Sequence, residues 1–341
     1  MYTLNLESST LSVPLAPEQS LLDACLTHGV ALPYNCRSGE CGQCVARLVC
    51  GSTHELPGAD PATYTDAMRA SGLVLTCMSY PRSDILLDVP AIQSDQPQIR
   101  EFDAVIDSVR WFGARTARVI VRSADPVPFR GGQYFEWHAP GAGRARSYSA
   151  ANVPGGNLIE FLVRIYPGGR ISKLLQRHEL AAGDVLSLRG PFGTYAFAPE
   201  EPGTAIFIAG GTGLAPVASI VQSALVGGAP GRPLAVFFGA RDQAELESAR
   251  SLQEAACRVP SLQFVPVLSD EPDGSAWTGR RGMVVDALRE TLGDQFGAQA
   301  YLCGPPAMVD AAIPILERCG LARSDIYCDR FVPAVSEEAT A

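Results

Sequence analysis

Short runs of alternating apolar and polar residues fill the middle third of the chain, between residues 102 and 200. They include FDAVIDSVRWF, ARVIVRS, YFEWHAP, NLIEFLVRIY and VLSLRGPFG, and turn residues separate them. A period of two is typical of β-strands with one buried face. The pattern predicts a small antiparallel β-barrel in this segment.

The last third has a different pattern, in which continuous apolar runs alternate with helix-like segments. TAIFIAGGTGLAPVASIVQSAL predicts a strand, a glycine loop and a helix, while LAVFFGAR, QFVPVL and AYLCGPP predict further buried strands. MVVDALRETL and AMVDAAIPILERC are helix-like, and Pro314 in the second is expected to kink or interrupt it. Alternating strands and helices predict a doubly wound parallel sheet.

The first hundred residues begin with two strand-like runs, YTLNL and LSVPLA. PEQSLLDACLTHG then predicts a helix with Pro17 and Glu18 in its first turn and Gly29 as its stop. Leu21 and Cys25 are four residues apart and share a face of that helix. The helix leads into a loop rich in cysteine.

Composition changes this picture little. The chain has 341 residues, 47% hydrophobic and 18% charged, so it is long enough for two or three globular domains. Its net charge of -9 argues against a nucleic-acid partner. The first 96 residues hold ten acidic residues against four arginines, which predicts a solvated face or a docking surface for a basic partner.

Two features bear on location. The N-terminus MYTLNLESST lacks the basic start and apolar core of a secretory signal. The uncharged stretch between Glu201 and Arg232 contains AGGTG and several polar residues, so a buried strand and helix explain it better than a membrane span. We therefore expect a cytoplasmic protein without a membrane partner.

Cys36, Cys41 and Cys44 in NCRSGECGQC follow a C-x4-C-x2-C spacing, and LVLTC offers Cys77 as a fourth sulfur. This is the spacing of plant-type [2Fe–2S] ferredoxins, in which four thiolates hold the cluster. Gly39 and Gly42 suit a tight loop with free N–H groups near sulfur.

Zinc and disulfides are the alternatives. Zinc favours paired C-x2-C hooks, and only Cys41 and Cys44 form one. Disulfides are unusual in a cytoplasmic protein. The spacing favours the iron–sulfur cluster, and the other cysteines are expected to be packing residues.

PYNCRSGECGQC followed by LTC resembles a plant-type ferredoxin domain, and about the first 95 residues fit one. The resemblance implies a β-grasp domain over residues 1–95, with a linker at 96–101.

Three pieces of the predicted barrel have residue types that suit contact with a phosphate or an aromatic ring. RSYSAAN contains Arg146, Ser147, Tyr148 and Ser149, which suit a phosphate, an aromatic ring and a ring nitrogen. PGGRISKLLQRH places Gly168 and Gly169 before a helix expected to begin near Ser172, whose N-terminus suits a pyrophosphate. GPFGTY is a turn that could close the barrel. Each piece alone also fits an ordinary strand end or turn.

Together and in this order, the pieces resemble the flavin domain of the ferredoxin–NADP reductase superfamily. The resemblance implies that Tyr148 stacks on the flavin of FAD, that Arg146 meets its phosphates and that Ser149 approaches flavin N5. The remaining flavin contacts that it implies come from Ser147, Arg164, Gly168, Gly169 and Ser172.

Gly210, Gly211, Thr212 and Gly213 form a glycine loop that departs from the G-x-G-x-x-G fingerprint, and no acid closes the next strand. GGTGLAP and CGPP match motifs of the same superfamily. The resemblance implies that Cys303, with Gly304, lies beside the nicotinamide and, with Ser149, aligns hydride donor and acceptor. Asp329 and Phe331 would close over the flavin, although the family acid is often Glu. Arg241 could meet a 2′-phosphate, but Ala240 offers no hydroxyl beside it, and the most similar reductases use NADH.

The sequence therefore predicts a multidomain α+β and α/β protein. Its parts are the ferredoxin domain, an FAD-binding antiparallel β-barrel (102–200), a doubly wound parallel α/β NAD-binding domain (201–335) and a tail (336–341). This order resembles the NADH-dependent reductase components of bacterial multicomponent oxygenases, above all those serving toluene, phenol or alkene monooxygenases with diiron hydroxylases.

The resemblance implies an enzyme that moves electrons from NADH through FAD and a [2Fe–2S] cluster to a hydroxylase docked on the acidic ferredoxin domain. We expect a monomer. The alternatives are a reductase for a Rieske dioxygenase or a P450, and a non-enzymatic redox sensor.

Overall fold

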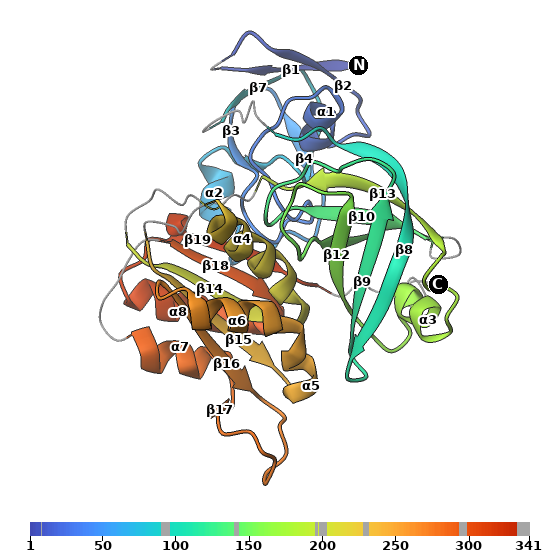
Figure 1. Cartoon of the computed structure of the whole chain (residues 1–341). Helices are drawn as coiled ribbons and strands as arrows, with labels where there is room; N and C mark the ends of the chain where they lie inside the picture. The colour runs from blue at the N-terminus through green and yellow to red at the C-terminus, as the bar shows by residue number, and fades with distance from the viewer. Residues whose placement is uncertain are drawn as a thin grey trace. The chain divides into compact units, whose positions relative to one another are not determined.

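A computed structural model describes residues 1–7, 9–89, 96–139, 143–194, 197, 203–227, 232–292 and 299–332. The predicted tail and part of the segment before residue 96 lie outside the described residues. The chain separates into two compact units, one of Met1–Gln98 with Phe192–Tyr195 and one of Ile99–Pro191 with Ala196–Ala341. Figure 1 colours the chain from its N-terminus to its C-terminus.

The first unit is built on a five-stranded mixed sheet of order β2-β1-β7-β3-β5, with a small β4-β6 pair beside it. Strands β1 and β7 are parallel, whereas the other pairs of the sheet are antiparallel. This arrangement confirms the predicted β-grasp domain. Its elements are β1 Tyr2–Leu6, β2 Ser12–Leu15, α1 Leu21–Thr27, β3 Val45–Cys50, β4 Thr53–Glu55, α2 Asp66–Ala70, β5 Leu73–Leu75, β6 Ser79–Pro81 and β7 Ile85–Asp88.

Helix α1 is shorter than its sequence pattern predicts. It begins at Leu21, because the Ser20 hydroxyl caps it by accepting a hydrogen bond from the Asp23 N–H, and Pro17 and Glu18 precede it. Leu21, Leu22 and Cys25 are fully buried. Burying each leucine contributes about 2 kcal/mol to the free energy of folding. This burial stabilises the helix that precedes the cysteine loop.

The barrel is a six-stranded sheet of order β11-β10-β13-β8-β9-β12. A bridge between Ala150 and Phe161 brings the first strand of that order back to the last and closes it. Trp137, Phe135 and Phe161 are fully buried at its centre. The elements are β8 Arg100–Phe112, β9 Thr116–Ser123, β10 Tyr134–His138, β11 Arg146–Ser149, β12 Leu158–Arg164, α3 Arg170–Gln176 and β13 Val185–Phe192.

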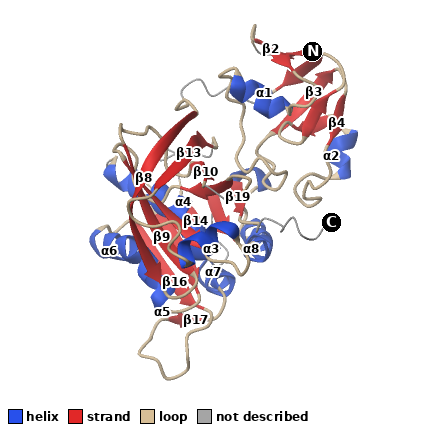
Figure 2. Cartoon of the chain, turned by 90° about the vertical axis from the view of Figure 1, so that its right-hand side faces the viewer, coloured by secondary structure: helices blue, strands red, loops and turns tan. Residues whose placement is uncertain are grey.

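The remaining sheet has six parallel strands in the order β17-β16-β15-β14-β18-β19. Its order reverses at β14, so the helices cover both faces, as predicted for a doubly wound sheet. Figure 2 shows α6 and α8 on opposite sides of these strands. The strands are β14 Ala205–Gly210, β15 Leu234–Ala240, β16 Leu262–Leu268, β17 Arg280–Arg281, β18 Gln299–Gly304 and β19 Ile326–Arg330.

Helices and 3-10 turns connect these parallel strands. They are η1 Gly211–Gly213, α4 Leu214–Val226, α5 Gln243–Leu246, η2 Glu247–Ala249, α6 Arg250–Arg258, α7 Val284–Leu292, α8 Pro306–Arg318 and η3 Arg323–Asp325. Helix α8 continues through Pro314, so the expected interruption does not occur. None of the described helices is long and apolar enough to cross a membrane.

Candidate functional site: three cofactor-binding regions

The cysteine loop lies between α1 and β3, and it brings the four predicted ligands together in two pairs. The Cys44 and Cys77 sulfurs are 3.2 Å apart. The Cys36 thiol is hydrogen-bonded to that of Cys41. Thr76, next to Cys77, donates its N–H to the Cys44 carbonyl at 3.0 Å, which holds the distant strand segment against the loop.

Two glycines make this loop compact. Gly42 has a φ of 72°, and a Cβ there would lie 2.7 Å from the Thr63 methyl carbon. Gly39 has a φ of 81° and packs against Ala59. Both positions therefore require glycine, as the sequence predicts.

The donor set fits a dinuclear iron–sulfur cluster. Each iron of a [2Fe–2S] centre takes two of the four thiolates, and the cysteines form two pairs. Among the residues that the structure describes, no group of three or more His, Cys, Asp or Glu is arranged to hold a single metal ion. The hydrogen bond between Cys41 and Cys36 lowers the pKa of Cys36 and raises that of Cys41, so the two thiols share one proton.

The RSYS segment forms β11, which pairs with β10 so that Tyr148 lies opposite Phe135. The Tyr148 ring contacts the buried Trp137, with centroids 4.5 Å apart. Burial raises the pKa of Tyr148, so its phenol stays neutral. Ser147 is exposed and Ser149 is buried. The tyrosine thus has a fixed ring orientation, which a stacking residue needs.

The predicted pyrophosphate loop precedes α3. Gly168 has a φ of 79°, and Gly169 is the N-cap of the helix. The Ser172 hydroxyl accepts the Tyr166 N–H at 3.0 Å, so it already fixes the loop. A Cβ on Gly169 would lie 2.8 Å from the Ser172 Oγ.

The glycine loop after β14 packs against the CGPP segment, backbone to backbone. A Cβ on Gly213 would overlap the Cys303 carbonyl and lie 2.8 Å from the Gly304 Cα. Gly304 has a φ of 142°, and a Cβ on it would lie 2.8 Å from the Gly210 carbonyl oxygen. The GGTG and CGPP motifs are therefore two halves of one structure at the carboxyl ends of β14 and β18.

The two site residues predicted near the C-terminus lie beside the CGPP segment. Asp329 lies opposite Cys303 in the β18–β19 ladder. The Phe331 N–H donates to the Gly304 carbonyl at 2.8 Å. Cys303, Gly304, Asp329 and Phe331 are thus brought together although about 25 residues separate the two motifs in the sequence.

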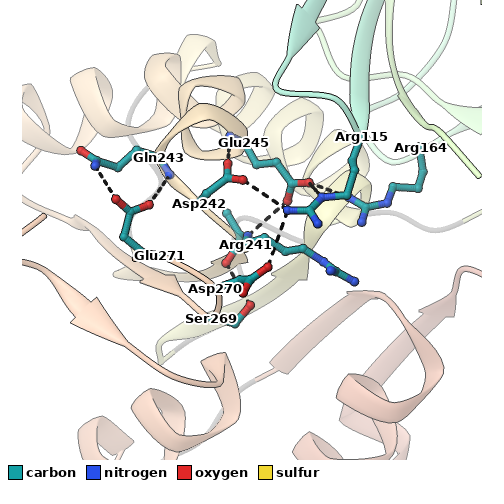
Figure 3. Close-up of polar contacts among 10 residues, drawn as sticks. Arg115, Arg164, Arg241, Asp242, Gln243, Glu245, Ser269, Asp270 and Glu271 are labelled. Carbon is teal, nitrogen blue, oxygen red and sulfur yellow. Dashed lines mark hydrogen bonds and ion pairs between the residues drawn. The ribbon is translucent and has the colours of Figure 1, made fainter. Parts of the chain in front are cut away.

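Arg164 and Arg241 meet at a residue that the sequence patterns missed, Glu245 (Figure 3). Arg164 Nη1 donates to Glu245 Oε1 at 2.8 Å, and the Arg241 N–H donates to Oε2 at 3.2 Å. The DQAE segment is a sequence signal for a helix start, since Asp242 caps α5 and Glu245 follows three residues later. That signal does not reveal the contact with the barrel.

The fold and these three regions define an iron–sulfur flavoprotein oxidoreductase of modular construction. Family models match each part: the 2Fe-2S iron-sulfur cluster binding domain at residues 4–82, the oxidoreductase FAD-binding domain at 114–197 and the oxidoreductase NAD-binding domain at 207–313.

Relatives match nearly the full length of the chain. The reductase component DmpP of phenol 2-monooxygenase from Pseudomonas sp. (strain CF600) is 32% identical over 98% of this chain and 95% of its own. The aromatic O-demethylase reductase subunit from Amycolatopsis sp. is 36% identical over 94% of this chain and 96% of its own. The crystal structure of the Amycolatopsis cytochrome P450 reductase GcoB is 34% identical, with a TM-score of 0.82 over 98% of this chain and 99% of that one. The chain therefore belongs to the family of NADH-dependent reductase components of bacterial oxygenases.

Proposed function

We propose that this reductase delivers electrons to the hydroxylase of a diiron monooxygenase acting on aromatic or alkene substrates. The support is the match to reductases named for hydrocarbon monooxygenases, among them a xylene/toluene monooxygenase component from Pseudomonas putida at 34% identity and a propane 2-monooxygenase component at 28%. FAD held in the barrel would supply the chemistry that links a hydride donor to a one-electron carrier such as an iron–sulfur cluster.

The chain's own residues hold and orient the reactants in this proposal. Cys36, Cys41, Cys44 and Cys77 ligate the cluster. Tyr148 supports the flavin ring, with Arg146, Ser147, Gly168, Gly169 and Ser172 around its phosphates. Within the GGTG loop, Gly211 faces open space, since a Cβ there would meet no atom within 4 Å, so the dinucleotide can approach the backbone closely at this position. Ser149 and Cys303 align the donor and acceptor carbon and nitrogen atoms, and no residue need act as a strong acid or base.

The preference for NADH has electrostatic support. The Asp270 N–H donates to the Arg241 carbonyl at 2.8 Å. This bond places Asp270, an acidic residue just after β16, beside the segment that follows β15. Its carboxylate is 65% exposed. A carboxylate at the carboxyl end of such a strand suits ribose hydroxyls and repels a 2′-phosphate.

The acidic ferredoxin unit is the proposed docking surface for the oxygenase. Its described acidic residues include five with exposed side chains: Glu7, Glu18, Asp66, Asp84 and Asp88. Such a surface steers a basic partner, and the effect weakens as salt screens it. We propose a monomeric reductase that meets its partner transiently.

A P450 system is the second candidate, because the Amycolatopsis relatives serve an aromatic O-demethylase and a cytochrome P450. Reconstitution separates the two. The purified chain, with NADH, is combined with a phenol hydroxylase-type diiron hydroxylase and, separately, with an aromatic O-demethylating P450. Product formation at low salt with the diiron enzyme alone supports the first function. Product with the P450 alone supports the second.

A further inference from the structure

The flavin barrel and the nicotinamide domain are joined by a buried carboxylate, Glu245, whose side chain is 4% exposed. Its Oε1 accepts hydrogen bonds from two barrel arginines, Arg164 Nη1 at 2.8 Å and Arg115 Nε at 3.3 Å. Its Oε2 accepts the Arg241 N–H at 3.2 Å. Figure 3 shows the two guanidinium groups converging on this carboxylate from the barrel side.

Each partner of Glu245 lies next to a segment that binds a nucleotide in the proposed function. Arg164 is the last residue of β12, five residues before the Gly169 N-cap of α3. The Ile165 N–H donates to the Arg115 carbonyl at 2.9 Å, so the two arginine segments are also tied together. Arg241 directly follows β15, at the sheet end where doubly wound folds bind dinucleotides.

The neighbouring charges reinforce this contact. Asp242 accepts Arg115 Nη2 at 3.3 Å with one carboxylate oxygen, and caps α5 through the Glu245 N–H with the other at 2.9 Å. The Asp270 carboxylate lies 3.8 Å from Arg115 Nη2. Arg118 Nη2 donates to the Ser248 carbonyl at 3.2 Å. Three barrel arginines thus meet the 242–248 segment of the nicotinamide domain.

A second attachment lies elsewhere on the same domain. The Ser219 hydroxyl of α4 donates to the carbonyl of Asn152, in the segment that follows RSYS, at 2.7 Å. One attachment leaves a domain able to rotate about it, whereas two fix its orientation. Losing the Glu245 contact would therefore change the angle between the domains without separating them.

We propose that Glu245 is a positioning residue for hydride transfer, which sets the orientation of the dinucleotide-binding strand end relative to the flavin-binding barrel. The inference rests on the proposed function. Hydride transfer is sensitive to this orientation, because the reacting atoms must be about 3–3.5 Å apart and a misplacement of about 1 Å can reduce a rate about a hundredfold.

Glu245→Gln is the informative substitution because glutamine keeps the shape of glutamate. Its amide has one accepting oxygen and two donor hydrogens, so it cannot serve both Arg164 and the Arg241 N–H. Asp107→Asn is the control, a carboxylate-to-amide change at another barrel ion pair. Asp107 lies on β8, and its carboxylate pairs with Arg122 of β9 at 2.6 Å within the barrel.

The experiment is anaerobic stopped-flow reduction of the bound flavin by NADH. We expect Glu245→Gln to lower the limiting rate at least about tenfold, to change the NADH concentration at half-maximal rate less than about twofold and to keep the FAD and cluster content of Asp107→Asn. If Glu245→Gln raised only that concentration, or matched Asp107→Asn in limiting rate, the positioning role would be wrong. Absence of flavin reduction in the unsubstituted protein would instead overturn the proposed function.

A double-mutant cycle with Arg164→Met gives a readout independent of activity. Denaturant unfolding of the holoprotein is measured for Glu245→Gln, Arg164→Met and the pair. The loss of unfolding free energy in the pair should be smaller than the sum of the two single losses, since each single variant already removes the Arg164–Glu245 contact. Additive losses would mean that the contact does not form in solution. Arg115→Met, which removes another barrel partner of Glu245, tests the rate should Glu245→Gln fail to fold. We expect the limiting rate to fall, and an unchanged rate would overturn the positioning role.

Discussion

The sulfur atoms of Cys44 and Cys77 lie 3.2 Å apart although 33 residues separate them in the chain. Thr76 enforces this proximity, because both its N–H and its hydroxyl donate to the Cys44 carbonyl, at 3.0 and 3.2 Å. These two bonds thus place the proposed fourth ligand beside the cysteine loop.

Replacing Cys77 with serine should remove the [2Fe–2S] cluster while leaving flavin reduction intact. We expect the visible and EPR signals of the cluster to disappear and electron delivery to the oxygenase to be lost. NADH oxidation with ferricyanide should persist, because the flavin can serve that acceptor. Cys50→Ser, at an exposed cysteine, is the control and should retain the cluster. A cluster in Cys77→Ser with unchanged spectra would contradict the assignment.

The Tyr148 ring should contribute to FAD affinity through stacking. Removing it in Tyr148→Ala should weaken FAD binding to the apoprotein about tenfold, since aromatic stacking contributes about 0.5–1.5 kcal/mol beyond area burial. Tyr148→Phe keeps the ring packed on Trp137 and should bind FAD within about twofold of the original affinity. Titration calorimetry of both apoproteins decides the matter, and equal affinities for the two variants would exclude stacking.

Gly213→Ala should destabilise the nicotinamide domain. Its Cβ would overlap the Cys303 carbonyl, so β18 or the glycine loop must shift, at a cost of about 1–3 kcal/mol. Gly227→Ala is the control, since Gly227 has a φ of -70° and a Cβ there meets the Ser223 carbonyl oxygen at an ordinary 3.5 Å. Denaturant unfolding compares the two. Equal stabilities would show that the backbone contact between the two motifs is not maintained in solution.

The sequence predicted what depends on local pattern or on spacing. The three fold types and the cofactor classes follow from short motifs whose spacing encodes their chemistry. The pairing of GGTG with CGPP follows from the order of the sheet, because β14 and β18 are neighbours in it.

Other features depend on tertiary contacts that no pattern records. Glu245 meets Arg164 across 81 residues and Arg115 across 130, so its role appears only once the barrel and the parallel sheet are packed together. Helix α8 continues past Pro314 because buried side chains on both sides of it, Ala312 and Ile315, hold it on the sheet. Packing there outweighs the helix-breaking preference of proline.

Asp270 should help to discriminate against NADPH. Its carboxylate follows β16 and lies beside the segment that begins at Arg241, so a 2′-phosphate bound there would meet a like charge. Two like charges about 4 Å apart near a protein surface repel by about 1–4 kcal/mol. Asp270→Asn removes this repulsion and leaves Arg241 to attract the phosphate. We expect kcat/KM for NADPH to rise about tenfold and that for NADH to fall, since a ribose hydroxyl loses its acceptor.

Asp273→Asn is the control, because Asp273 is exposed in the same loop but lies farther along the chain from the strand end. It removes one negative charge and so reports the effect of net charge alone. Steady-state ferricyanide reduction gives kcat/KM for each variant with NADH and with NADPH. If Asp273→Asn raised NADPH use as much as Asp270→Asn, net charge would set the preference. If neither variant changed kcat/KM for NADPH, the dinucleotide would bind with its ribose away from Asp270, and Arg241 would lose its proposed place in the site.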